Sequence, residues 1–512
     1  MKKVFTLCLM LITYQCMISQ NENIPKKRTQ NGFAKIDFLS IKMPITTIPD
    51  EQNMGFTGIH YNLTFNDLWY TGVGLYGAVS GNRGGFFTLG VNAGIKKEIY
   101  KNIYLDTGFH FGGGGGAGAP DGGGAFILPH VNLGYNFKNF SINTGYSYVN
   151  FFDNGLIKGH QLNFGLEVPL NFNYSYSNNK EKEYDINELK QTTWNATPKR
   201  NAIMFHFNNL NVLSDAKASN GEILKGKTIN LAGFEFSSYL NKNWFTFVKV
   251  DGAYNGIRAG YMDVFVGAGY LANFNKNRTK IAAKFGIGAG GGGGVDTKGG
   301  FLLYPDISLE QKLFNDIYVS LNKGYLLTPN KDFYTSTFGL GIKYYVNRNG
   351  VKLEENNFKK AKFKGLDVIV KHDVYFNAER ETDPTENMHQ ISLQVNLDLN
   401  KNVFLAAQTS FANFGNAGAY GEGLLGLGAK TNMLFNNTTS FFTQFIGGAA
   451  GGGNISTGEG LIFKPSAGIN YKVSNTLNLR AAGGFVSAKG GTLSSPFINF
   501  GISYHLSFLK LK

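Results

Sequence analysis

The chain has 512 residues, of which 67 are glycine and 14% are aromatic, while only 16% are charged. This composition excludes a disordered chain and differs from that of an ordinary globular protein. The formal net charge is +14, but the basic residues are spread over turns and linkers, so no nucleic-acid partner is indicated.

The first residues indicate a secretory signal peptide, residues 1–19. Lys2 and Lys3 precede an apolar stretch that is too short to span a membrane. Lipid attachment at Cys16 is an alternative, which the large residues before it disfavour. Cys8 also lies in this segment, so the exported chain has no cysteine and must be held together by hydrogen bonding and burial. After residue 19 no apolar run reaches about 18 residues, which excludes a helical membrane protein.

One pattern then occurs three times along the chain. It consists of a glycine run, a proline within an apolar stretch, a Gly-aromatic pair and a Phe-Gly-Leu/Ile triplet. The three copies are Gly112–Gly116, Pro129, Gly145-Tyr146 and Phe164-Gly165-Leu166; Gly290–Gly294, Pro305, Gly324-Tyr325 and Phe338-Gly339-Leu340; and Gly447–Gly453, Pro465, Gly484-Phe485 and Phe500-Gly501-Ile502. The period is far longer than that of a solenoid, so each unit is a whole domain or one third of a large sheet.

Within each repeat, apolar and small polar residues alternate with period two, which predicts strands. We expect about eight per repeat. In the first repeat they are expected near 33–43, 54–65, 69–80, 85–99, 104–115, 123–137, 140–151 and 160–174. Most are about ten residues or longer, which is enough for a tilted strand to cross a bilayer.

The turns between these strands are of two alternating kinds. Short ones contain Asn, Asp and Lys, as at Lys101-Asn102 and Asn315-Asp316, and predict tight hairpins. Longer ones, such as 44–53 and 116–122, lie between them. Short turns on one side and long loops on the other are typical of bacterial outer-membrane barrels. A soluble β-sandwich is the alternative, but the second face carries Gly, Asn, Ser and Thr and suits a lumen better than water.

The last strand alternates without a break through Phe500, Ile502, Tyr504, Leu506 and Phe508. In this feature the sequence resembles the β-barrel outer-membrane proteins of Gram-negative bacteria. Its Phe-Gly-Leu/Ile triplets resemble the closing strands of the small, glycine-rich, eight-stranded members of that group. The resemblance implies the outer membrane as location, its lipid bilayer as partner, and recognition of the C-terminal strand by the barrel-insertion machinery. One departure is that Leu509–Lys512 follow the last aromatic residue.

The fold expected is therefore all-β: a transmembrane antiparallel up-and-down β-barrel of about 24 strands in three eight-strand repeats. We expect the repeats at 33–174, 201–346 and 365–510, with polar periplasmic linkers at 175–200 and 347–364. Three small tandem barrels are one arrangement, favoured by the long junctions. We favour the other, one wide barrel, because large or charged inward residues that could fill narrow cylinders are scarce.

Candidate chemistry is sparse. The glycine runs lack the helix and the Lys-Ser/Thr of a phosphate loop, so we interpret them as sites of bending or of close approach by another backbone. A further hypothesis is that the tips of these glycine-rich hairpins fold inward and narrow a pore. His110 and His130 are placed symmetrically about the turn at Pro120, so we expect them to face each other across the hairpin, near enough to share a metal ion. The pair is not repeated, however, so we interpret both as lumen residues. The same applies to the acids Asp106, Glu167 and Asp263.

The remaining histidines are scattered without a Ser-His-carboxylate grouping, so the sequence predicts no catalytic, cofactor-binding or metal-binding residues and no enzyme. We expect porin-like passive passage of small solutes. The alternatives are a structural or scaffold component of an envelope assembly or secretion apparatus, with an unknown protein partner, and a secreted β-rich adhesin.

Overall fold

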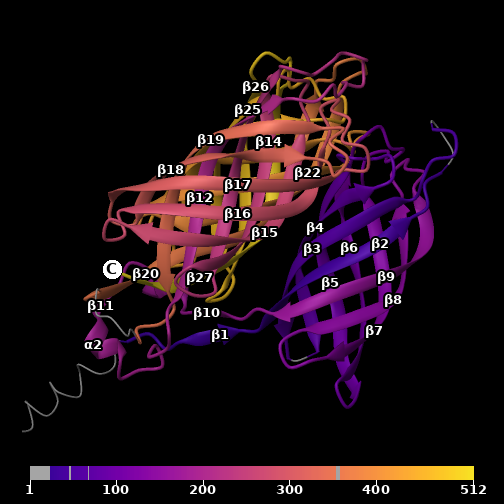
Figure 1. Ribbon diagram of the computed structural model, residues 1–512. Coiled ribbons are helices and arrows are strands. Elements are labelled where there is room, and N and C mark those ends of the chain that lie inside the picture. The colour runs from indigo at the N-terminus through magenta and orange to yellow at the C-terminus, as the bar shows by residue number, and fades with distance from the viewer. Residues whose placement is uncertain (1–23, 45–47, 67, 353–357) are drawn as a thin grey trace, which may run out of the picture.

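The computed structural model describes residues 24–512 apart from 45–47, 67 and 353–357, so the expected signal peptide lies outside the described residues (Figure 1). Antiparallel strands make up almost all of the regular structure. Helical structure in the described part is confined to η1 (Ser177–Asn179) and α2 (Ile186–Leu189). None of the described helices has the length and apolar character needed to span a membrane.

The first eight long strands form a closed barrel, barrel 1, which is indigo to purple in Figure 1. It closes because β9 pairs with β2, with Ile36 opposite Leu166. Its strands are β2 (Gly32–Ile41), β3 (Met54–Phe65), β4 (Trp69–Ser80), β5 (Phe87–Tyr100), β6 (Ile103–Gly115), β7 (Phe126–Asn136), β8 (Ser141–Phe151) and β9 (Lys158–Pro169).

Barrel 2 follows the same plan and closes where β19 pairs with β12 over fourteen residue pairs, Lys199–Arg348 to Val212–Thr335. Its strands are β12 (Lys199–Val212), β13 (Thr228–Tyr239), β14 (Trp244–Asn255), β15 (Met262–Phe274), β16 (Thr279–Gly291), β17 (Phe301–Phe314), β18 (Ile317–Leu327) and β19 (Tyr334–Arg348).

Barrel 3 closes where β27 pairs with β20, with Val370 opposite Ile502. Its strands are β20 (Lys360–Ala378), β21 (Glu386–Asp398), β22 (Val403–Phe414), β23 (Gly421–Lys430), β24 (Thr439–Gly451), β25 (Leu461–Lys472), β26 (Leu477–Ala488) and β27 (Ser494–Leu511). Among the described strands, the pairing between β19 and β27 consists of one residue pair, Arg348 opposite Lys510, and links the sheets of barrels 2 and 3.

The all-β, antiparallel fold with 24 barrel strands in three groups of eight is confirmed, but the preference for one wide barrel is wrong. The last strand of each group bonds to the first strand of its own group and not to that of the next. The expectation failed because the inward faces do carry large and charged side chains, which fill the narrow cylinders.

The short turns lie where the Asn-rich dipeptides predict them. Asn102 and Asn315 adopt φ of 70° and 45°, the left-handed backbone that a tight hairpin requires. The described parts of the short turns and of both linkers lie at one end of the barrels, the short-turn end, and those of the long loops at the other, the long-loop end (Figure 1).

The segments between the barrels fold into a small cap at the short-turn end. The expected strand 160–174 divides there, because β10 (Phe172–Tyr174) leaves barrel 1 and pairs with β1 (Arg28–Gln30). Next, β11 (Glu183–Asp185) pairs with the start of β20. The cap has an apolar core that it shares with the ends of β20 and β27, made by Ile186, Leu189, Trp194, Val351, Ala361, Phe363, Leu509 and Leu511. Leu509 and Leu511, which lie beyond the last aromatic residue, therefore pack into this core.

Candidate functional site: filled lumens and a glycine-lined junction

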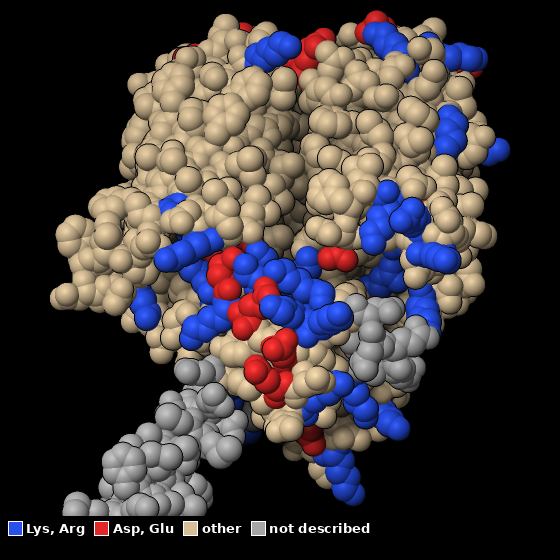
Figure 2. Space-filling model, turned by 90° about the vertical axis from the view of Figure 1, so that its left-hand side faces the viewer, with Lys and Arg blue, Asp and Glu red and all other residues tan. Residues whose placement is uncertain are grey.

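The outward faces of all three barrels are apolar and exposed. Phe164 is 48% exposed on barrel 1, Leu340 51% on barrel 2 and Phe500 61% on barrel 3. Figure 2 shows walls almost free of charge, with Lys, Arg, Asp and Glu gathered mainly around the cap below them. Closed antiparallel barrels with an apolar outside and a polar inside are the architecture of transmembrane barrels of the Gram-negative outer membrane. The lipid bilayer is thus the medium that these side chains contact.

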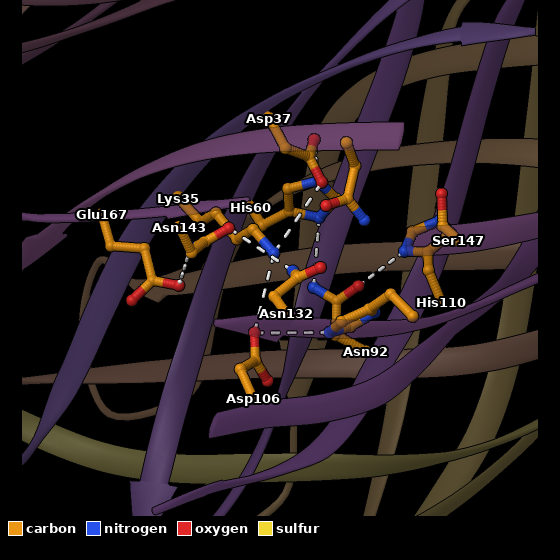
Figure 3. A network of polar contacts seen from close by, with 12 residues as sticks. Lys35, Asp37, His60, Asn92, Asp106, His110, Asn132, Asn143, Ser147 and Glu167 are labelled. Carbon is orange, nitrogen blue, oxygen red and sulfur yellow. Dashed lines mark hydrogen bonds and ion pairs between the residues drawn. The ribbon is translucent and has the colours of Figure 1, made fainter. Parts of the chain in front are cut away.

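The lumen of barrel 1 holds a buried polar network (Figure 3). Lys35 Nζ lies 4.0 Å from Asp37 and 3.9 Å from Asp106, so one cation stands between two carboxylates. His60 Nε2 lies 3.1 Å from Asp37. Tyr70 and Tyr76 donate hydroxyl protons to Asp106 and Asp37, each at 2.8 Å.

A second group lies beside the first in the same lumen, since Glu167 is opposite Lys35 and Lys96 is opposite Asp106. Lys96 is ion-paired with Glu167, and Asn143 donates an amide proton to Glu167 at 2.8 Å.

A cavity of about 20 Å³ beside Lys35 and His60 has room for about one water molecule. No solute of metabolite size fits such a cavity.

The lumen of barrel 2 contains a larger set of ion pairs. Lys249 contacts Asp251 and lies 3.4 Å from Asp263. Lys284 contacts Glu235 and lies 3.5 Å from Asp306. Lys343 reaches Glu310 at 2.9 Å and Glu235 at 3.7 Å. The side chains of all these residues are at most 3% exposed, so water does not pass between them.

Barrel 3 repeats the arrangement with different residues. Lys464 lies 3.4 Å from Asp373 and 2.9 Å from Glu422, and Lys371 lies 3.5 Å from Asp373. Tyr375 and Tyr420 donate hydroxyl protons to Glu422 at 2.7 and 3.1 Å.

Towards the long-loop end each lumen is plugged by apolar side chains. In barrel 1 the plug includes Phe56, Phe126 and Phe151, and the loop residue Ala119 packs against it. Val295 and Ile455, at the matching positions of the next two glycine loops, belong to the plugs of barrels 2 and 3. These loop residues therefore pack against the apolar plugs, and narrowing of a pore by the hairpin tips stays a hypothesis.

Most of these lumen residues were missed in the sequence, although a signal was present. Lys35 and Asp37, Lys249 and Asp251, and Lys371 and Asp373 each form a Lys-x-Asp pair on one strand, and i,i+2 residues share a face. A Lys-x-Asp pair inside an alternating strand therefore predicts an inward ion pair.

The predicted histidine pair does not converge on one point. His110 Nδ1 lies 2.6 Å from Asn92 Oδ1, whereas His130 Nε2 lies 3.3 Å from both Asp106 and Tyr70. Both are lumen residues, as are Asp106, Glu167 and Asp263. No group of three or more His, Cys, Asp and Glu side chains in the described ranges is arranged to hold a metal ion.

The glycine runs bring the backbones of neighbouring barrels together. Between barrels 1 and 2, Gly84 N–H donates to Lys298 O at 3.0 Å. A Cβ added to Gly85 would lie 2.2 Å from Gly292 N. The interpretation of close backbone approach is thereby confirmed.

The other two junctions use the same parts of the repeat. Gly418 N–H in barrel 3 donates to Gly122 O in barrel 1 at 3.1 Å, and a Cβ on Gly113 would meet Ala412 O at 2.3 Å. Between barrels 2 and 3, a Cβ on Gly451 would lie 2.5 Å from Gly260 N.

In each case the loop after the third strand of one barrel lies against the glycine hairpin of another, so the barrels form a ring. Apolar residues from all three meet inside it: Phe87, Leu89, Val264, Ala289 and Phe411.

No protein-family model matches the chain, and no curated protein matches it. Among solved structures, OccK11 (OpdR) of Pseudomonas aeruginosa is 11% identical, with 94% of this chain and 96% of that chain covered and a TM-score of 0.21. The outer membrane protein OpdK of the same species is 8% identical, with 94% and 99% covered and a TM-score of 0.23. A mutant of the ferric enterobactin receptor PfeA from P. aeruginosa, in complex with enterobactin, is 8% identical, with 93% and 81% covered and a TM-score of 0.29. Likeness of this size says nothing about the activity of this chain.

Proposed function

We propose that the chain is a structural or scaffold component of the outer membrane, whose three barrels anchor an envelope assembly and do not serve as open pores. The observation that carries this proposal is the filling of all three lumens by buried ion pairs and apolar plugs. Small barrels of eight strands have interiors that side chains fill. Passive passage of solutes would require these networks to break, and removal of one partner from a buried ion pair costs about 3–5 kcal/mol.

The cap supports the same proposal. In bacterial outer-membrane barrels the short turns face the periplasm, so the short-turn end would present the cap to that compartment. A segment that packs through an apolar core onto the ends of β20 and β27 is a fixed surface and not a loose tether, which suits attachment of a periplasmic partner. Secretion as a free adhesin is disfavoured by the exposed apolar walls, because water would contact them directly.

Planar-bilayer recording with the purified full-length mature chain tests the proposal. We expect no conductance steps, while an open porin reconstituted by the same procedure gives them. Stable steps from the wild-type chain would contradict the scaffold function and restore porin-like passage.

A further inference from the structure

One buried lysine in barrel 2 differs from the others in its surroundings. Six lysines that are buried in the lumens have a carboxylate within 4.0 Å: Lys35, Lys249, Lys284, Lys343, Lys371 and Lys464. Lys280, on β16, is only 2% exposed, yet no carboxylate of the described residues is within that distance.

Aromatic rings surround the ammonium group of Lys280 instead. Its Nζ lies 3.4 Å from the ring centre of Tyr345 and 4.0 Å from that of Tyr318. The nearby carboxylate of Glu310 is already engaged, because it accepts hydrogen bonds from Lys343 at 2.9 Å and from the Tyr345 hydroxyl at 2.5 Å. A cation–π contact contributes up to about 2 kcal/mol, whereas burial of an ion costs several. The ammonium of Lys280 is therefore poorly compensated in this site, and an anion beside it would stabilise its charged form.

A second cation stands at the same place. The Arg200 guanidinium carbon lies 4.6 Å from the ring centres of both Tyr239 and Tyr345. Arg200 is the second residue of β12, Lys280 the second of β16 and Tyr318 the second of β18, so the group lies at the short-turn mouth of barrel 2. Arg200 is partly exposed at this mouth and offers an approach from solvent.

We propose that the short-turn mouth of barrel 2 binds a small oxyanion, such as phosphate or a phosphate group, between the Arg200 guanidinium and the Lys280 ammonium. A planar guanidinium can donate two parallel hydrogen bonds to such an anion, and the ammonium supplies a point charge below it. This site does not depend on the scaffold function.

Barrel 1 provides an internal comparison. There Lys96 Nζ stands 3.9 Å from the ring centre of Tyr104 and 4.9 Å from that of Phe33, near the same end, but it is ion-paired with Glu167. The carboxylate neutralises this cation, so barrel 1 lacks the uncompensated lysine on which the oxyanion site of barrel 2 depends.

Calorimetric titration of the detergent-solubilised full-length mature chain with inorganic phosphate, at constant ionic strength in chloride buffer, tests the site. We expect Lys280→Met to weaken binding at least about tenfold, since a charge-assisted hydrogen bond is lost, with a smaller loss for Arg200→Gln and partial rescue in Lys280→Arg. Lys138→Met, at an exposed turn of barrel 1 on the same end, is the matched control and should bind as the wild type does.

A second measurement separates this proposal from a purely structural cation–π role. In phosphate-free buffer the unfolding midpoint of Lys280→Met should lie above that of the wild type, because an uncompensated charge has been removed; phosphate should then raise only the wild-type midpoint. A lower midpoint for Lys280→Met, or equal phosphate binding by both proteins, would overturn the proposal. Binding to micelles that contain phosphatidylglycerol, without binding of free phosphate, would support the site and identify a lipid headgroup as the source of the anion.

Discussion

Trp194 belongs to the apolar core of the cap. Its side chain is fully buried, its indole N–H donates to Pro25 O at 2.6 Å, and its ring meets Phe363 edge-on at 5.2 Å. Trp194→Ala should destabilise the cap by about 3–5 kcal/mol through the cavity it leaves. Limited proteolysis should then cut within 175–198 much faster than in the wild type.

The control for this experiment is Trp244→Ala, since Trp244 is 52% exposed on the outside of barrel 2. The barrels themselves should keep their heat-modifiable migration in both variants. Equal cleavage of Trp194→Ala and wild type would show that the cap core does not hold this segment.

Asp121 makes the junction of barrels 1 and 3 sensitive to pH. Burial raises the pKa of Asp121 to about 7, although the Gly116 N–H that donates to its carboxylate at 2.7 Å acts in the opposite direction. The pKa of Asp121 in the folded protein lies above the ordinary value of 3.8. The protonated side chain therefore contributes to folding stability fully below pH 3.8, and this contribution is lost as the pH rises through about 7. We expect the amides of residues 116–124 to be better protected from hydrogen exchange at pH 6 than at pH 8, after correction for intrinsic rates.

Asp121→Asn keeps an oxygen that can accept the Gly116 hydrogen bond but removes the charge. Its protection should therefore be the same at both pH values. If the wild type and this variant show the same pH dependence, another group is responsible.

At the scale of the elements, the glycine hairpins should tolerate no side chain where they contact another barrel. Gly113 faces the Ala412 carbonyl so closely that Gly113→Val forces the backbones apart, and we expect a loss of about 1–3 kcal/mol from overpacking. The urea unfolding midpoint of the detergent-solubilised chain measures this.

Gly159, at the start of β9, is the matched control. An added Cβ there would meet no atom within 4 Å, so Gly159→Val should unfold at the wild-type midpoint. If Gly113→Val and Gly159→Val behave alike, the close approach of the backbones is not what requires glycine.

The strands themselves were predictable because alternation and turn chemistry are local. Residues 54–65 and 69–80 were expected as strands and are β3 and β4 at the same bounds. The division of 160–174 was not predictable, because only pairing with β1, far away in sequence, draws β10 out of the barrel.

At the scale of the whole molecule, the sequence did not decide whether each group of eight strands closes on itself or all strands form one barrel. An even number of strands places both linkers at one end in either arrangement, and hydrogen bonds between strands more than a hundred residues apart leave no local pattern. The polarity of the lumen and its Lys-x-Asp pairs were predictable from local sequence. The partners of Lys464, Asp373 and Glu422, come from other strands and were not.

Pairs of cysteines test the closure directly, in a mature chain that is expected to have no other cysteine. Ile36→Cys with Leu166→Cys joins β2 to β9, where the two residues are opposite each other, and should cross-link readily. Leu166→Cys with Phe205→Cys would join β9 to β12 and should not. The reverse result, by mobility of the oxidised chain on denaturing gels, would favour a single wide cylinder.

The ring has a consequence for assembly. Each barrel offers a loop to one neighbour and a hairpin to the other, so the contact is directional and its two halves are distinct. With three barrels, every loop and every glycine hairpin has its partner within one polypeptide. No unpaired loop or hairpin then remains to bind a fourth barrel. A chain shortened by one unit would instead expose one unmatched half at each end, and would be prone to chain-to-chain polymerisation.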